Sequence, residues 1–345
     1  MVKLSRANQF RLSYVAIIAG ASVAILLAES RKPSQPTTPE LNLKSVQFSG
    51  PLQSFDLRQS TIPVQEIRSG GPPKDGIPAL SNPLLIEPNA ALYLNDNDRV
   101  VGVVIQEESR AYPLKILNHH EIINDRIGET PIVVTYCPLC DSAAVFDRRT
   151  PLGEREFGVS GLLYNSNVLM YDRGGQTESL WSQVKAQGVT GPAAEQKLKA
   201  LPMELTTWSD WRTRNPQTKV VSDQTGHRRN YQTNPYANYF ATPRLMFPVT
   251  PSKDWLPAKT PVLGVWTQNG QARAYSIAQL GEGGKVIRDS LGEASIVIQV
   301  DRKTNSLRVI ESAPSLQWMN SFWFAWYAMH PHTDVFNKPF AGDNR

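Results

Sequence analysis

The sequence predicts a β-rich α+β fold made of two related antiparallel β units, the first of which carries a long insert. Short β-branched runs between turn signals recur along the chain, for example at residues 99–105, 132–136 and 295–300. Long stretches with helical periodicity are scarce, and proline is frequent, with 26 residues among 345. Part of the sequence is also repeated, which predicts that the β structure comes as two similar units.

The internal repeat has two parts that differ in their offset. Residues 101–103, 110–112, 122–129 and 132–134 recur 162 to 164 positions later. A second set recurs 115 positions later, and it pairs Trp208, Trp211, Pro216, Thr218 and Val220 with Trp323, Trp326, Pro331, Thr333 and Val335. We therefore place the first unit at 75–250 and a second, degenerate unit at 258–340. The change of offset indicates an insert of about 49 residues in the first unit, between about 147 and 207.

Residues 1–30 have the features of a signal anchor or of a cleaved signal peptide. Lys3, Arg6 and Arg11 precede an uncharged, apolar stretch at 12–28. Basic residues before such a stretch keep the N-terminus in the cytoplasm and direct the rest of the chain outward. A proline-rich linker follows at 31–50. We therefore expect an extracytoplasmic protein, in the periplasm or at the outer face of the inner membrane, that touches the membrane through its N-terminal segment only.

The excess of basic residues belongs to this N-terminal segment. The chain has 36 basic and 31 acidic residues, and residues 1–32 hold five of the former and one of the latter. The remainder therefore carries 31 basic and 30 acidic residues, a net charge of +1. Such a balance gives no indication of nucleic-acid binding, and we expect no nucleic-acid partner.

The most specific feature of the sequence is a pair of cysteines. Cys137 and Cys140 are the only cysteines in the chain, and they follow a β-branched run at 132–135. Because the return strand is expected at 143–146, the cysteines lie in a turn between two strands. Such a turn resembles a metal-binding knuckle, whereas a thioredoxin-type motif opens a helix.

A hairpin is expected between residues 121–124 and 132–136, with paired residue numbers that add up to 256 or 257. In that register, Cys137 faces His119 or His120 across the strands. Two thiolates and an imidazole favour a copper ion, with zinc as the second choice. The predicted metal ligands are Cys137, Cys140 and His120, with His119 and Met170 as further candidates.

We expect such a site to serve in metal handling or electron transfer, and two other functions stay open. The cysteines can form a thiol–disulfide redox pair, since exported thiols oxidise unless a metal protects them. Alternatively, they only fasten a turn in a non-enzymatic binding or assembly module. The second unit has Asp301 and Thr304 at the positions of the cysteines, so its turn is made without them. The sequence identifies no protein or small-molecule partner and no catalysed reaction.

Several motifs occur together in the first unit: NHHEIIND at 118–125, TYCPLC at 135–140, FGVSGLLYN at 157–165, YDR at 171–173 and SLWSQ at 179–183. In this combination the chain resembles the bacterial family called domain of unknown function 3179, over roughly residues 75–338. The resemblance implies an exported bacterial protein, and it implies no particular reaction. The family pattern usually has glycine after the second cysteine, where this chain has Asp141.

Aromatic residues near the C-terminus predict a packing helix between the two units. They occur between 318 and 327 with a spacing of four residues, which places them on the faces of a helix. His330 and His332 follow, and we expect them at the capped end of this helix and in the turn after it, rather than at a metal ion.

Overall fold

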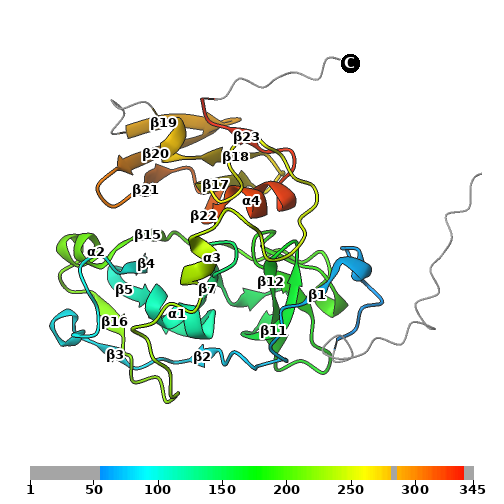
Figure 1. Ribbon diagram of the computed structural model, residues 1–345, viewed down its shortest axis with the longest axis horizontal. Helices are drawn as coiled ribbons and strands as arrows, with labels where there is room; N and C mark the ends of the chain where they lie inside the picture. The colour runs from blue at the N-terminus through cyan, green and yellow to red at the C-terminus, as the bar shows by residue number, and fades with distance from the viewer. Residues whose placement is uncertain (1–54, 281–285, 338–345) are drawn as a thin grey trace, which may run out of the picture. The chain divides into compact units, whose positions relative to one another are not determined.

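Antiparallel β-sheets dominate the structure, as the sequence predicts. The computed structural model describes residues 55–280 and 286–337. Its largest sheet has eight strands, in the order β2 (Leu80–Ser81), β6 (Ile122–Ile127), β7 (Thr130–Cys137), β8 (Ser142–Asp147), β22 (Leu316–Phe322), β17 (Pro261–Thr267), β18 (Ala272–Tyr275) and β23 (Asp334–Val335). Figure 1 shows how the sheets are arranged.

The other sheets are smaller. One has the order β1 (Arg68–Ser69), β11 (Glu156–Tyr164), β12 (Asn167–Arg173), β13 (Leu180–Ser182) and β14 (Gln187–Gly188). Another has the order β15 (Glu204–Thr207), β4 (Arg99–Ile105), β5 (Glu108–Pro113), β16 (Lys219–Val221) and β3 (Leu85–Ile86). The remaining two are β19 (Val286–Leu291), β20 (Ala294–Asp301) and β21 (Ser306–Ser312), and the pair β10 (Gly153–Glu154) and β9 (Arg149–Thr150).

The helices are short and lie between strands. The α-helices are α1 (Leu114–His120), α2 (Trp208–Arg214), α3 (Ala237–Phe240) and α4 (Trp323–Met329). The 3₁₀ turns are η3 (Val64–Glu66), η4 (Pro88–Ala90), η5 (Gly191–Ala193) and η6 (Ile277–Gln279).

The predicted signal segment at 1–30 and the linker at 31–50 lie outside the described residues, so both stay predictions. Within the described part, no helix is long and apolar enough to span a membrane. The described residues belong to one compact unit. The division into units at 75–250 and 258–340 also stays a prediction.

The hairpin before the cysteines has the predicted register. β6 and β7 pair antiparallel, with Ile122 opposite Thr135 and Ile127 opposite Thr130, so that paired residue numbers add up to 257. β8 is the predicted return strand, and Cys137 at the end of β7 pairs with Ser142 at its start. The Cys-Pro-Leu-Cys turn therefore lies between two strands.

The two predicted units contain the same arrangement of elements. In the first, β4 and β5 form a hairpin, β16 pairs with β5 in parallel, and α2 packs on β4. In the second, β17, β18, β23 and α4 take these places. The indole N–H of Trp211 donates to Thr218, and that of Trp326 donates to Thr333, both at 2.9 Å. These matched contacts are those that a duplication requires, and the duplication itself stays a prediction.

The central sheet runs through both predicted units. Strand β8 of the first unit pairs with β22 of the second, with Asn320 opposite Ala143. The predicted insert instead supplies β11 to β14, which form a separate sheet with β1. The insert is therefore an added layer that leaves the repeated arrangement intact.

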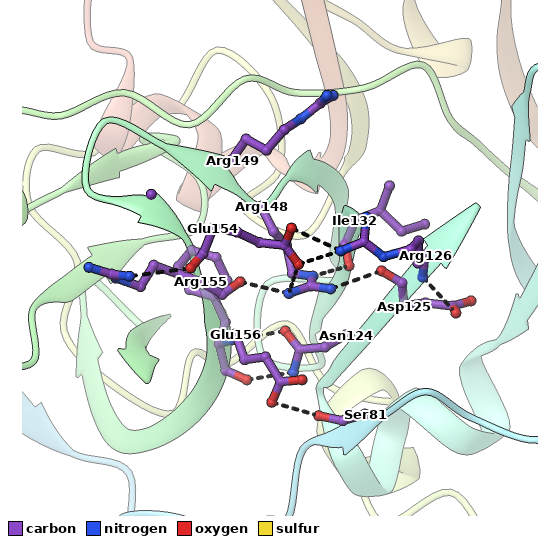
Figure 2. A network of polar contacts seen from close by, with 12 residues as sticks. Ser81, Asn124, Asp125, Arg126, Ile132, Arg148, Arg149, Glu154, Arg155 and Glu156 are labelled. Atoms are coloured by element: carbon purple, nitrogen blue, oxygen red, sulfur yellow. Dashed lines mark hydrogen bonds and ion pairs between the residues drawn. The ribbon is translucent and has the colours of Figure 1, made fainter. Parts of the chain in front are cut away.

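Arg148 fixes the start of the insert to the central hairpin. Its buried guanidinium donates to the backbone carbonyls of Ile132 and Arg155 at 2.9 Å and of Asp125 at 3.3 Å. Figure 2 shows these bonds converging on one side chain, with the carboxylate of Glu154 beside it at 3.4 Å. One arginine thus ties β6, β7 and the beginning of β11 together.

The prediction of an aromatic helix between residues 318 and 327 is confirmed only for the residues from Trp323 onward. Residues 316–322 form strand β22, which pairs with β17 along its whole length, and α4 begins at Trp323. Strand pairing here overrides the helical spacing of Trp318 and Phe322, because the backbone of these residues completes the central sheet. His330 caps the end of α4 as predicted, and its N–H donates to the carbonyl of Trp326 at 2.9 Å.

We expect Gly264 on β17 to tolerate no side chain, because Trp326 lies over it. A Cβ atom at this position would lie 2.3 Å from the indole ring. Gly264→Ala should lower the free energy of unfolding by roughly 1–3 kcal/mol, as overpacking of a core does, measured by urea denaturation. In a Trp326→Leu background, Gly264→Ala should lower the free energy of unfolding by clearly less. An equal cost in both backgrounds would show that the indole is not the cause.

Candidate functional site

Cys137 and Cys140 lie together in the turn between β7 and β8. The N–H of Cys140 donates to the carbonyl of Cys137 at 3.1 Å, which closes a four-residue turn. Both thiols are free, and the side chains are 2% and 0% exposed. Asp141 follows with a φ of 43°, the left-handed region that favours glycine. Its carboxylate is held there by Arg99 at 2.9 Å and by the hydroxyl of Tyr136 at 2.8 Å.

The insert contacts the thiols from the other side. The connection between β11 and β12 turns at Asn165 and Ser166, which both have positive φ. This turn places the carbonyl of Ser166 3.2 Å from the sulfur of Cys140 and 3.8 Å from that of Cys137. The thiol of Cys140 donates to this carbonyl, which favours its protonated form.

A buried polar cluster fixes the insert to the cysteine turn. The amide nitrogen of Gln183 donates to the hydroxyl of Thr135 at 2.9 Å and to the carbonyl of Ser142 at 3.1 Å. The amide oxygen of Gln183 accepts from Asn167 at 2.9 Å. All four side chains are fully buried. Because buried polar groups are costly to leave unpaired, this cluster holds the two segments in one geometry.

A segment around α3 covers the thiols. The hydroxyl of Tyr239 donates to the carbonyl of Leu139 in the cysteine turn at 2.9 Å. Asn165 accepts from the N–H of Thr250 at 2.9 Å, and its amide donates to the carbonyl of Thr250 at 2.8 Å. The hydroxyl of Ser166 donates to the carbonyl of Phe247 at 3.2 Å.

The two thiols have different pKa values. Burial raises the pKa of Cys137, but the thiol of Cys140 and the backbone N–H groups of Val168, Cys140 and Leu139 outweigh burial and lower it below its ordinary value. Burial raises the pKa of Cys140 well above its ordinary value, and the neighbouring Cys137 raises it further. Cys137 is therefore the more acidic thiol of the pair, and Cys140 keeps its proton to higher pH.

Glu121 lies next to Cys137 and was not among the predicted site residues. It is the single residue between α1 and β6, with φ 58° and ψ −32°, an unfavourable backbone conformation for a residue other than glycine. Its side chain is 8% exposed. Burial, and to a lesser extent the charge of Cys137, raise the pKa of Glu121 to about 8, although a hydrogen bond from Tyr236 opposes the rise.

These groups meet in a small cavity. Cys137, Glu121 and Tyr236 line a space of about 80 Å³, whose remaining walls are largely apolar. Among them are Leu139 of the cysteine turn and Phe247 of the covering segment. Cys140 does not line this cavity. The geometry thus presents one sulfur, one carboxyl and one phenol to a small bound group.

The structure does not bring the predicted histidines to the cysteines. His120 is buried, and its ring nitrogens lie 2.7 Å from the carbonyl of Pro78 and 2.7 Å from the hydroxyl of Tyr231. His119 lies 3.2 Å from the carbonyl of Thr233. The register of β6 and β7 is as predicted, but its extension to these residues is wrong, because α1 occupies 114–120 and the chain reverses at Glu121.

Burial lowers the pKa of His120 to about 4, so its imidazole is neutral near pH 7 and bonded at both nitrogens. Met170 on β12 is fully buried in the same apolar cluster as both cysteines. Among the described residues, no group of three or more His, Cys, Asp or Glu side chains is arranged to hold a metal ion. The copper or zinc ion therefore stays a prediction, with Cys137 and Cys140 as the predicted ligands that lie together.

Sequence reasoning missed Glu121, Tyr236 and Ser166. The hairpin register carries a signal for the first of these, because it places the start of β6 beside Cys137. The helix end that turns Glu121 toward Cys137 is not visible in the hydrophobic pattern. Tyr236 lies 115 residues from Glu121 in the sequence, and Ser166 lies 26 residues from Cys140. Local patterns do not report contacts over such separations.

Glu121 should make stability depend on pH. A carboxyl whose pKa is raised from 4.5 to about 8 keeps its proton in the folded state while the unfolded state loses it. The free energy of unfolding should therefore fall as pH rises through this window, by up to roughly 1.4 kcal/mol per pH unit. Glu121→Gln should flatten this fall in urea denaturation between pH 5 and pH 8. The exposed Glu129→Gln in the same hairpin is the control, and parallel curves for wild type and Glu121→Gln would contradict the assignment.

Comparison with known proteins places the chain in a family. The model of the family described as protein of unknown function DUF3179 matches residues 74–317. This match includes both cysteines, Glu121, Tyr236 and the insert. No curated protein and no solved structure matches the chain. Because the match covers well over half of its residues, the chain belongs to the DUF3179 family.

Proposed function

We propose that the protein is a thiol–disulfide redox protein in which Cys137 is the attacking thiolate and Cys140 is the resolving thiol. The observation that carries this proposal is the arrangement of the two sulfurs. Cys137 lines a cavity together with Glu121, while Cys140 lies behind it, against the carbonyl of Ser166. The extracytoplasmic location expected from the sequence is one in which disulfides form and exchange.

The turn geometry is compatible with a disulfide between the two cysteines. A four-residue turn closed by its i to i+3 hydrogen bond brings its end Cα atoms within about 7 Å. A disulfide requires a Cα separation of roughly 4.4–6.8 Å. Both sulfurs lie near the same backbone carbonyl, that of Ser166, which is 3.2 Å from Cys140 and 3.8 Å from Cys137. Oxidation of the pair therefore needs only a small adjustment of the turn.

The chemistry balances with the groups present. The thiolate of Cys137 attacks one sulfur of a small disulfide, forms a mixed disulfide, and releases the other half as a thiolate. The protonated Glu121 gives its proton to this leaving group. The sulfur of Cys140 then attacks Cys137, its proton goes to the departing second thiol, and the Cys137–Cys140 disulfide forms. The bound disulfide is reduced by two electrons, and the protein is oxidised by two.

Reaction with a small disulfide tests the proposal. Full-length reduced protein incubated with bis(2-hydroxyethyl) disulfide should form the Cys137–Cys140 disulfide, and its rate should rise with a midpoint below about pH 8.5, the ordinary pKa of cysteine. Cys140→Ser should stop at a mixed disulfide on Cys137, visible as a mass increase. Cys137→Ser should react slower by roughly tenfold or more, because only a buried thiol of raised pKa is left.

The two serine variants are matched controls for each other, since the chain has only two cysteines. Equal rates for both variants would contradict the assigned roles. Metal analysis of the same preparations addresses the alternative of a copper or zinc protein. A stoichiometric metal that is lost in Cys137→Ser, with no disulfide formed in wild type, would replace the redox proposal by the metal one.

A further inference from the structure

We propose that a second cavity, between the insert and the second β unit, binds a small aromatic carboxylate. This cavity has a volume of about 240 Å³. The insert supplies one wall, which includes Lys185, Lys197 and Leu198. The second unit supplies the other wall, which includes Trp266, Met329 and His330. It shares no lining residue with the cavity at Cys137 and Glu121.

The charge of the lining selects an anion. The half-buried ammonium group of Lys185 makes no hydrogen bond or ion pair with the described residues. The ammonium group of Lys197, an exposed residue, donates to the carbonyl of Gln268 at 2.9 Å and forms no ion pair with the described residues. No aspartate or glutamate lines the cavity. Burial lowers the pKa of Lys185, which is the expected effect on a cation that lacks a counterion.

The apolar part of the lining favours a flat group beside the anion. His330 stacks on Trp326 with ring centres 4.0 Å apart, and Trp266 lies 6.0 Å from His330 at an angle of 30°. Burial lowers the pKa of His330 to about 4, so this imidazole is neutral near pH 7. Its Nε2 lies 3.0 Å from the carbonyl of Val184, which fixes the ring. A rigid aromatic wall next to two ammonium groups suits a ring that bears a carboxylate.

The corresponding place in the predicted first unit is a cavity of about 250 Å³ whose lining includes the charged residues Glu204 and Arg214. There, Arg214 forms ion pairs with Glu204 at 2.8 Å and with Asp210 at 2.5 Å. At the positions 115 residues later, the second unit has methionine or alanine: Met319, Ala325 and Met329. The internal ion pairs are thus absent from the second unit, and the lysines of the insert face the space beside Met329.

The volume sets an upper limit to the ligand. Pockets for drug-sized molecules have volumes of about 300–1,000 Å³. A space of about 240 Å³ therefore suits a single ring with a carboxylate rather than a nucleotide or a peptide.

Calorimetric titration of the full chain with benzoate tests this inference, with benzamide as the neutral analogue of the same shape. We expect benzoate to bind at least roughly tenfold more tightly than benzamide, because its charge meets two lysines. Lys185→Met with Lys197→Met keeps most of each apolar stem and should reduce benzoate affinity to the level of benzamide. Lys199→Met removes an exposed lysine that does not line the cavity, and it should leave benzoate binding unchanged.

Three results of the benzoate titrations would each overturn the inference. They are the absence of benzoate binding, equal binding of benzoate and benzamide, and an unchanged benzoate affinity in the double lysine variant. A titration with inorganic phosphate tests whether the aromatic wall of the cavity contributes to binding. Phosphate binding as tight as that of benzoate would show that the apolar wall contributes nothing, and it would equally reject an aromatic carboxylate as the ligand class.

Discussion

The backbone reversal at Glu121 determines what surrounds Cys137. Helix α1 ends at His120 and strand β6 begins at Ile122, so one residue must change the direction of the chain. A left-handed conformation of a residue with a Cβ costs on the order of 1–3 kcal/mol. It persists here because the backbone of Glu121 makes two hydrogen bonds. Its N–H donates to the carbonyl of Leu117, and its carbonyl accepts from the N–H of Tyr136, both at 2.8 Å. The same reversal directs both histidines away from the cysteines and brings a carboxyl to them.

Glu121 and Cys137 are both buried and line the same cavity, so the two groups do not titrate independently. A negative charge on either group in this apolar site disfavours a negative charge on the other. Burial raises the pKa of Glu121 to about 8, and the charge of Cys137 contributes to this rise. In the proposed exchange reaction, the attacking sulfur and its proton donor would be these two coupled groups. The strained turn would then have a chemical role in addition to its role in packing.

Local pattern was sufficient for the fold class, for the β6–β7 register and for the cysteine turn between two strands. Local pattern failed where contacts with distant segments, or the end of a neighbouring element, determine where a strand or helix begins or ends. His119 and His120 were assigned to a strand because the register was extended across a helix end, and Trp318 was assigned to a helix because its pairing with β17 is remote in sequence. Tyr236, Ser166 and Lys185 reach their sites through contacts between distant segments. Such contacts depend on how the sheets pack, which hydrophobic periodicity does not encode.

The insert connects the two sites through consecutive residues. Gln183 bonds to the cysteine turn, the carbonyl of Val184 accepts from His330, and Lys185 lines the second cavity. Such continuity alone does not make the sites cooperative, because coupling requires an element with two arrangements that each ligand biases differently. Gln183 and Val184 are fully buried, and the amide of Gln183 is bonded at both its nitrogen and its oxygen. The structure shows one arrangement of this segment, so the geometry gives no reason to expect that a ligand in one of the two proposed sites changes the affinity of the other.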